Sequence, residues 1–259
     1  MLLIDATLAA LAAEGRTVGT QLTQKWVKAL SAIGISRVKR PNEPVVAECA
    51  VYGLDGALAG DYQAIFKRLR RLGHLEVVFG DSRGWASALA FAWLEEGGTG
   101  TVASLTGVGG LPALERLRVF LHLNGRMLLP KEGRDFAVIR QLWGELTGQS
   151  LDLFHPVLGE GLFVGEAGIH VDCWSKDPSL YELFPPALVG AKRALAIGRH
   201  SGQGALRLKC RQLGLACPQE ALAGLLDSVR DKAVELERSL TDSEFAALAR
   251  GRLETRLEA

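Results

Sequence analysis

Residues 165–204 are the stretch from which the rest of the chain is interpreted, and they read GEAGIHVDCWSKDPSLYELFPPALVGAKRALAIGRHSGQG. Three titratable side chains, Glu166, His170 and Asp172, lie within seven residues of one another, and Tyr181 follows them closely. The stretch ends in Arg199-His200-Ser201-Gly202. Core packing does not explain this density of glycine, histidine, aspartate, lysine and proline, so we expect the segment to serve function or an unusual backbone path.

Helices flank this segment on both sides. Apolar residues at helical spacing predict helices over residues 114–123 and 136–146 before it. After it we expect a helix over residues 203–213 with Ser201 as its N-cap, and two amphipathic helices within residues 218–257. Thr241-Asp242-Ser243-Glu244 has the spacing of a capping box and predicts where the last helix begins.

The first 110 residues alternate between strand and helix patterns. Short apolar runs predict strands near residues 2–4, 36–39, 45–51, 75–79 and 101–105. Between them, Thr23 and Asp61 are predicted to cap helices, and residues 85–95 form a mostly apolar helix. Repeated strand–helix units indicate parallel strands joined by crossover helices, so the predicted fold class is α/β.

Composition excludes several classes of protein. The chain of 259 residues has a formal net charge of +1, which gives no reason to expect nucleic acid or an anionic membrane as its main partner. The longest uncharged apolar run, residues 85–94, is too short to span a bilayer. Residues 1–4 are read as a buried strand rather than a signal peptide because Asp5 interrupts them. The four cysteines show no paired spacing, and the expected location is the cytoplasm.

Residues 165–204 resemble the region behind the catalytic barrel of the homocitrate synthase and 2-isopropylmalate synthase family. That family carries the pattern ESGIHxDG…KDPxxYExxxPxxVG…xxGKHSGxxAL, and about thirty residues here follow it in order with nearly constant spacing. The resemblance implies an enzyme family that condenses acetyl-CoA with a 2-oxo acid on a metal-dependent TIM barrel. It predicts three parts: a partial (β/α) barrel in residues 1–125, a helical linker in residues 126–164, and a post-barrel α-rich domain in residues 165–259.

The resemblance also implies that the barrel is truncated. A complete barrel takes ~250 residues, whereas only about four strand–helix units precede Gly110. Three family motifs have also lost their polar residues: TLRDGEQ corresponds to residues 7–13, HxHND to residues 78–82, and NGLGERAGN to residues 106–112. The first supplies an Arg for the 2-oxo acid and an Asp for the metal, but this chain has alanine at those positions. Asp81, Glu48 and Asp55 are better explained as solvated residues than as a rebuilt metal site, so no metal ligand is predicted.

Four residues are candidate site residues by resemblance: His170, Glu166, Asp172 and Tyr181. The family implies that His170 assists deprotonation of the acetyl-CoA methyl group, a task that suits imidazole because its pKa lies near neutrality. We expect Glu166 and Asp172 to orient it. The alternative is that His170 and Asp172 only brace a turn and that Tyr181 only packs.

Three functions remain open from the sequence. The chain is an acyltransferase subunit that lends His170 to a partner with a complete barrel, or a non-catalytic regulatory or structural partner, or an independent enzyme with a metal-free activity on a related acid or thioester. Whether the chain is itself an enzyme is therefore open. We expect it to bind no cofactor alone, with acetyl-CoA and a divalent metal present only in a complex. The expected partner is a second copy of the chain or a full-length family member, since a half barrel leaves strand edges open.

Overall fold

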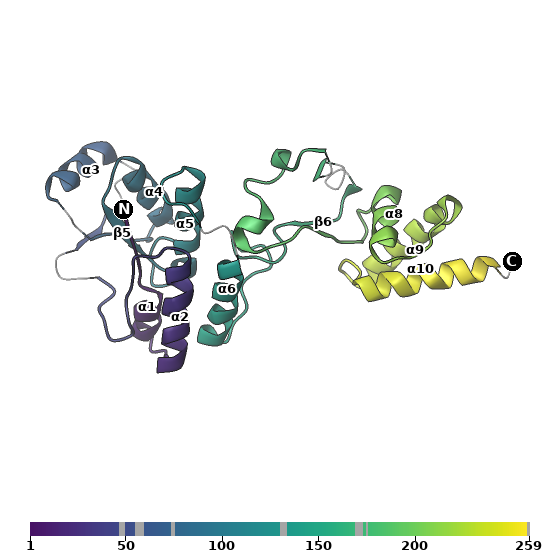
Figure 1. Ribbon diagram of the computed structural model, residues 1–259, viewed down its shortest axis with the longest axis horizontal. Helices are drawn as coiled ribbons and strands as arrows, with labels where there is room; N and C mark the ends of the chain where they lie inside the picture. The colour runs from purple at the N-terminus through teal and green to yellow at the C-terminus, as the bar shows by residue number, and fades with distance from the viewer. Residues whose placement is uncertain are drawn as a thin grey trace. The chain divides into compact units, whose positions relative to one another are not determined.

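The computed structural model describes residues 1–46, 50–54, 60–73, 76–129, 134–168, 173–174 and 176–257. The chain divides into two compact units (Figure 1). The first contains Met1–Gly159 with Ala187–Gly190, and the second contains Glu160–Pro186 with Ala191–Ala259. None of the helices in the described residues has the length and apolar character needed to cross a membrane.

A parallel sheet forms the centre of the first unit. In the described residues it has five strands in the order β2-β1-β5-β4-β3, and every paired neighbour is parallel. The strands are β1 (Leu2–Asp5), β2 (Arg37–Val38), β3 (Val51–Gly53), β4 (Val77–Phe79) and β5 (Gly100–Ala103). The predicted α/β class with a central parallel sheet is confirmed. The two edge strands, β2 and β3, are only two and three residues long, and short edge strands limit pairing with other chains.

Helices cover one face of this sheet. They are α1 (Thr7–Ala13), α2 (Thr20–Ala32), α3 (Tyr62–Arg71), α4 (Ala86–Glu95), the 3₁₀ turn η2 (Leu105–Gly107), α5 (Leu114–Leu123) and α6 (Arg134–Thr147). Phe79 of β4 points to this face, where Phe66 of α3 meets it edge-on at 6.0 Å between ring centroids. Phe66 meets Trp93 of α4 in the same way at 5.4 Å. These buried aromatic contacts hold the crossover helices against the strands.

The opposite face, here called the inner face, is covered by irregular chain. Ile4, Val102 and Val78 lie in one row across three neighbouring strands. Together with Ala6 and Leu111 they form a buried cluster, and Val45, Val46 and Ala50 pack on it. The connection between β2 and β3 therefore closes the inner face of the sheet.

A buried ion pair accompanies this covering segment. Lys39 follows β2, is 1% exposed, and pairs with Glu76 at the start of β4. The Lys39 ammonium also donates to the carbonyl oxygen of Val45 at 2.9 Å. A buried lysine requires such partners. Through them Lys39 links the covering segment at Val45 to the residue before β4.

Several predicted elements need correction. Residues 45 and 46 are not strand, because they lie over the inner face and the strand begins only at Val51. Thr23 is not an N-cap: α2 begins three residues earlier, and the Thr23 hydroxyl donates to the Gly19 carbonyl. Helix α1 was not predicted. The Asp61 cap is confirmed, since its carboxylate accepts from the Ala64 N–H at 2.9 Å.

The second unit is mostly helical around a small apolar core. It contains the parallel strands β6 (Val164–Gly165) and β7 (Ala194–Leu195), the 3₁₀ turns η3 (Pro178–Leu180) and η5 (Gln219–Ala221), and helices α8 (Gln203–Gln212), α9 (Leu222–Glu235) and α10 (Asp242–Leu257); the 3₁₀ turn η4 (Pro186–Val189) spans the division between units. Ile197, Leu206, Leu222, Val229 and Phe245 are fully buried in this core.

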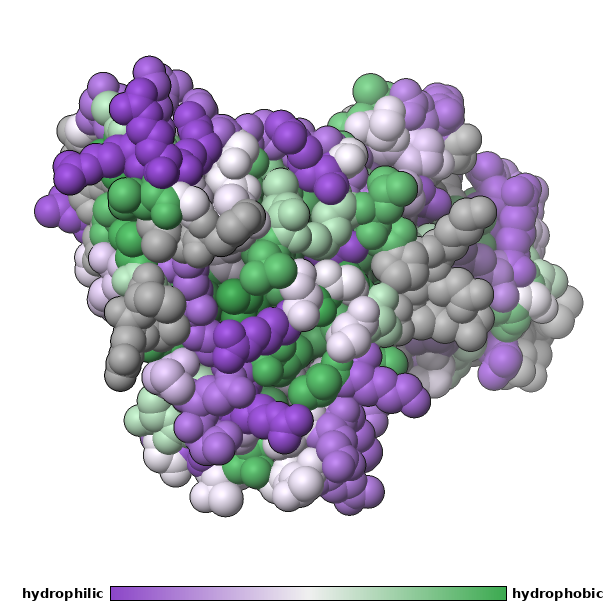
Figure 2. All heavy atoms as spheres, turned by 60° about the vertical axis from the view of Figure 1, so that its left-hand side comes forward, coloured by the Kyte–Doolittle hydropathy of each residue, from purple (hydrophilic) through white to green (hydrophobic). Residues whose placement is uncertain are grey.

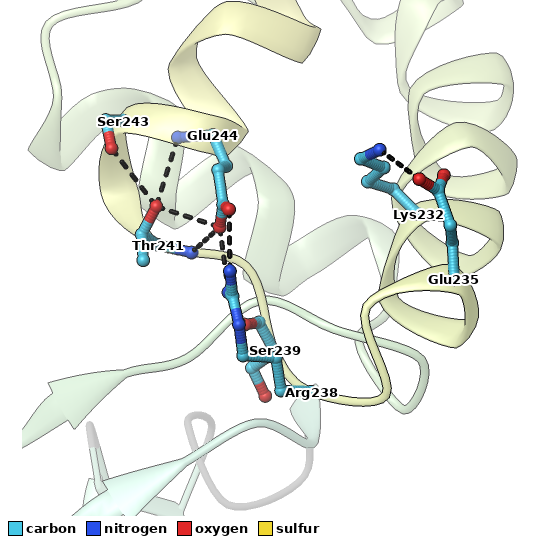
Figure 3. Close-up of polar contacts among 7 residues, drawn as sticks. All are labelled: Lys232, Glu235, Arg238, Ser239, Thr241, Ser243 and Glu244. Carbon is cyan, nitrogen blue, oxygen red and sulfur yellow. Dashed lines mark hydrogen bonds and ion pairs between the residues drawn. The ribbon is translucent and has the colours of Figure 1, made fainter.

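The predicted capping box is confirmed (Figure 3). The Thr241 hydroxyl accepts from the Glu244 N–H at 3.3 Å, and the Glu244 carboxylate accepts from the Thr241 N–H at 2.8 Å. Arg238 holds the same carboxylate through two bonds, at 2.7 and 2.9 Å. These contacts lower the pKa of Glu244 to about 2, with the Arg238 hydrogen bond as the main cause.

The covering of the inner face predicts a mutational result. Lys39→Met should lower the free energy of unfolding by about 3 kcal/mol, because Glu76 is left as an unpaired, largely buried charge. The double variant Lys39→Met/Glu76→Met should regain most of that loss. Urea unfolding measures both. Lys25→Met is the matched control, since its pair with Glu145 is exposed, and it should change stability by less than about 1 kcal/mol. A stable Lys39→Met variant would show that the segment covers the face without this ion pair.

Candidate functional site

At the carboxyl end of β1, a buried carboxylate joins three segments. Asp5 is 0% exposed; it accepts from the backbone and hydroxyl of Thr7 and from the Trp26 indole N–H at 3.0 Å. The Thr7 hydroxyl in turn accepts from the Leu105 N–H at 2.8 Å. Burial raises the pKa of Asp5 to about 6, against the opposing effect of these hydrogen bonds. Because Asp5 points to the helix-covered face, it organises structure rather than an open site.

The segments that match the family motifs contain no catalytic polar side chains. Residues 7–13 form the buried helix α1, and Val78 lies in the inner-face cluster. Asp81 accepts from the Ala86 N–H at 2.9 Å and thereby serves the start of α4. Among the described residues, no three His, Cys, Asp or Glu side chains gather as metal ligands. The residues present in this part of the chain do not fit a divalent metal; Glu48, Asp55 and His74 lie outside the described residues.

The sequence prediction missed Glu115, in the first turn of α5. Its side chain is 0% exposed, and one carboxylate oxygen, Oε2, accepts from the Thr106 N–H at 3.0 Å. The other oxygen, Oε1, has no hydrogen-bond partner among the described residues. Thr106 holds a positive φ of 59°, a conformation that side chains other than Gly and Asn rarely adopt, and this aims its N–H at Glu115. Burial raises the pKa of Glu115 to about 7.

His155 lies opposite the unpartnered oxygen. Its Nε2 is 3.8 Å from Glu115 Oε1, and its side chain is 13% exposed. Its Nδ1 lies 2.9 Å from the carbonyl oxygen of Pro156. Burial lowers the pKa of His155, an effect that the Pro156 contact and Asp152 oppose. The pair therefore brings together two acid–base groups whose pKa values are both shifted by burial.

A sequence signal for Glu115 existed. Within the helix predicted for residues 114–123, Glu115, Arg118 and His122 share one helical face with apolar residues. Arg118 is also buried, and it donates to the carbonyl oxygens of Ile33, Met127 and Leu128. Burial lowers the pKa of Arg118 to about 10. Charged residues on the apolar face of a helix predict buried polar contacts, and here they fix α5 in the unit.

An open cavity of about 230 Å³ lies on the other side of the loop that follows β5. Its lining includes Thr106, Gly107, Glu14 and Arg16. The Arg16 guanidinium is tied to the Thr147 carbonyl oxygen at 2.9 Å. The cavity presents one cation and one anion, with no histidine or cysteine among its lining residues, so its side chains suit the binding of a small polar molecule.

In the second unit, Glu166 is the centre of a polar cluster. Its carboxylate accepts from the His200 N–H at 2.6 Å and from the Ser239 hydroxyl at 2.9 Å. A Cβ at Gly198 would lie 2.7 Å from Glu166 Oε1, so a larger residue there would require the Glu166 carboxylate to shift. The predicted Ser201 cap is wrong: the Ser201 hydroxyl instead accepts from the Gly198 N–H at 3.0 Å, and α8 has Gly202 at its N-cap.

The other candidate residues of this segment are placed only in part. His170 and Asp172 lie outside the described residues, so the predicted group of four is not tested. Tyr181 is 50% exposed, and its hydrogen bond with Cys173 raises its pKa. The next residue, Glu182, forms a two-bond pair with Arg193 at 2.6 and 2.7 Å.

The two buried carboxyl groups predict how stability depends on pH. A carboxyl whose folded pKa is raised stabilises the fold below its unfolded pKa, and this contribution is lost as the pH rises through the folded value. For Asp5 and Glu115 the loss should occur as the pH rises through about 6 and about 7. The lowered pKa of His155 has the opposite effect: its contribution to the free energy of unfolding is lost as the pH falls into the acidic range.

Glu115→Gln isolates the larger effect. Between about pH 6 and about pH 8.5 the wild-type chain should lose about 1–2 kcal/mol of unfolding free energy through Glu115, and the variant should not. Urea unfolding followed by tryptophan fluorescence measures the difference, since Trp26 and Trp93 are buried in this unit. Parallel pH profiles for the two proteins would mean that Glu115 does not titrate in this range.

Comparison with known proteins finds relatives for part of the chain. Residues 157–237 match the family described as "Homocitrate synthase post-HMGL domain-like". The chain is 36% identical over 107 residues to the omega subunit of homocitrate synthase from Clostridium pasteurianum, which covers 41% of this chain and 30% of that protein. It is 34% identical over 168 residues to 2-isopropylmalate synthase 2 from Caldanaerobacter subterraneus, covering 64% and 44%.

A third relative extends the same pattern. Homocitrate synthase 1 from Nostoc is 28% identical over 170 residues, which cover 64% of this chain and 45% of the relative. The chain therefore spans less than half the length of these curated relatives.

Proposed function

Because the chain is similar to homocitrate and 2-isopropylmalate synthases, we propose that it serves the condensation of acetyl-CoA with a 2-oxo acid as one subunit beside a chain with a complete barrel. The observation that carries this proposal is the combination of a family-type second unit with a first unit in whose described residues no three His, Cys, Asp or Glu side chains gather. Neither unit alone supplies the full chemistry.

The strand order supports a reduced barrel. In a closed parallel barrel each strand pairs with the next, and the last strand pairs with the first. Here β1 pairs with β2 on one side and β5 on the other, while β3, β4 and β5 follow in sequence. This is the order expected when the first two and last three strands of a barrel remain and its middle is absent. The covering segment takes the place of the missing strands on the inner face.

The inner face also explains why a partner is needed. In a barrel enzyme, side chains at the carboxyl ends of the strands form the site. In this chain Leu111 joins the apolar cluster on the inner face, and Val45 and Val46 pack against it. A 2-oxo acid needs cationic or metal contacts for its carboxylate, and these would come from the partner.

His170 is the group that we propose this chain contributes. By resemblance it acts on the acetyl-CoA methyl group, with Glu166 and Asp172 orienting it and Tyr181 nearby. Two observations support a subunit role. Glu166 accepts hydrogen bonds from His200 and Ser239, and these anchor the chain at position 166. One relative, from Clostridium pasteurianum, is itself named as a subunit.

A second function rests on a specific observation about the same residue. Glu166 already accepts two hydrogen bonds and touches Gly198, so its carboxylate is engaged in structure. This favours a non-catalytic partner that keeps the family's second unit for assembly. Figure 2, which brings the first unit forward, shows apolar surface in the middle of the displayed face, bordered by hydrophilic residues. An independent, metal-free activity is the third alternative and would use the cavity beside Arg16.

His170→Ala separates the first two functions. The complex of this chain with a full-length family member should turn over acetyl-CoA and 2-oxoglutarate, and the variant complex should be slower by about a hundredfold or more. The KM for the 2-oxo acid should change little, because the partner binds it. His200→Gln is a matched control: its imidazole is exposed and contacts Arg199, and activity should persist. Full activity of the His170→Ala complex would identify the chain as a non-catalytic partner.

Metal content and assembly of the isolated chain test the partner requirement. Elemental analysis of the untagged protein should find less than one divalent cation per chain. Light scattering should find either a dimer or aggregates that disappear when the partner chain is added. One metal per chain would revive independent catalysis. A stable monomer that unfolds cooperatively would contradict the expectation that open strand edges require a partner chain. It would mean that the covering segment is enough to stabilise the sheet.

A further inference from the structure

The pair Glu115–His155 has a geometry that structural packing alone does not explain. Glu115 Oε1 is fully buried and has no hydrogen-bond partner among the described residues, although its neighbour Oε2 accepts from Thr106. The two basic nitrogens near it, Arg116 Nε and His155 Nε2, are each 3.8 Å away. An unpaired buried carboxylate oxygen destabilises a fold, so its retention calls for a role.

The tautomer of His155 defines what the pair lacks. A carbonyl oxygen only accepts, so the contact between Nδ1 and the Pro156 carbonyl requires a hydrogen on Nδ1. In the neutral ring Nε2 then carries a lone pair, and Glu115 Oε1 lies 3.8 Å from this nitrogen. Two acceptors oppose each other until one proton lies between them. A proton on either atom allows the two to approach from 3.8 Å and form a charge-assisted or neutral hydrogen bond.

We propose that Glu115 and His155 form a proton-operated latch that fastens residues 148–159 to the first turn of α5. With one proton between Oε1 and Nε2 the latch is closed; without it, a buried carboxylate faces an imidazole lone pair and the segment detaches. No bond other than this hydrogen bond forms or breaks, and the proton comes from solvent through the partly exposed His155.

The surroundings set the pH at which the latch acts. On α5, Arg116 favours an ionised Glu115 and disfavours a charged His155, whereas Asp152, on the segment itself, favours a charged His155. The loop after β5 contributes only the Thr106 N–H, and α6 contributes Arg140, which donates to the Leu158 carbonyl at 3.4 Å. Burial raises the pKa of Glu115 to about 7, so the closed form loses its proton near neutrality.

Hydrogen exchange reports the latch directly. The amide of His155 bonds to the Asp152 carbonyl at 3.0 Å, and the amide of Gly159 bonds to the His155 carbonyl at 2.7 Å. After correction for intrinsic exchange, protection of these amides in the wild-type chain should fall above about pH 7, by up to about tenfold per pH unit. Protection of the amides within α4 should not change in this way.

Variants assign the effect to the pair. Glu115→Gln carries an amide that donates to Nε2 at every pH, so its protection should stay high above neutrality. His155→Ala should show low protection throughout. His122→Gln is the matched control, because the Nδ1 of that histidine accepts from the Leu129 N–H at 3.0 Å and takes no part in the pair; the variant should behave as the wild type does.

Nitrogen NMR of the wild-type imidazole gives a test that needs no variant. At about pH 8 the shifts of His155 should show the Nδ1–H tautomer. The Nε2–H tautomer would overturn the proposal, and so would wild-type protection that is constant with pH. An equal fall of protection in Glu115→Gln and wild type would also overturn it.

Discussion

A parallel sheet has two apolar faces, and each must be covered. In the first unit this constraint is met in two different ways. Helices cover the face that carries Phe79 and Asp5, as in any crossover fold. On the inner face, Val45, Val46 and Ala50 of the connection between β2 and β3 pack on the cluster of Ile4, Val78 and Val102. Lys39 and Glu76 hold that connection through an ion pair that is almost completely buried. The closure of the sheet, and with it the loss of an open site at the strand ends, depends on this segment.

The carboxyl end of the sheet keeps polar residues, but they serve the fold. Asp5 joins β1, α2 and the loop after β5 through Trp26, Thr7 and Leu105. Glu115 holds the same loop through Thr106. Burial weakens the ionised form of each carboxyl, which is why their pKa values rise to about 6 and about 7. Perturbed acid–base groups are common at active sites, yet here Asp5 contacts Thr7 and Trp26, and Glu115 contacts the Thr106 N–H and lies 3.8 Å from His155.

The second unit shows how a family motif divides between chemistry and structure. Glu166 and the loop that contains Gly198 and Ser201 form one polar cluster with Ser239, and these contacts explain why glycine stands at position 198. The candidate acid–base residues His170 and Asp172 follow within six residues of this anchored point. A segment that is anchored through Glu166, close in sequence to a candidate catalytic residue, suits a site that is presented to another chain. The same anchor also suits a surface used only for assembly. The activity of the complex with His170→Ala distinguishes the catalytic role from the assembly role.

Local rules of the sequence determined a definite part of this protein. Alternating apolar runs predicted the parallel α/β unit, and capping chemistry predicted the helix starts at Asp61 and Thr241, because these signals act over three or four residues. Motif spacing indicated the family. Only the tertiary structure decided that residues 45 and 46 cover the inner face, that Thr23 lies inside α2, and that Glu115 is buried opposite His155. The reason is physical: burial and pairing of a side chain depend on which distant segments pack against it, as His155 does from forty residues away along the chain.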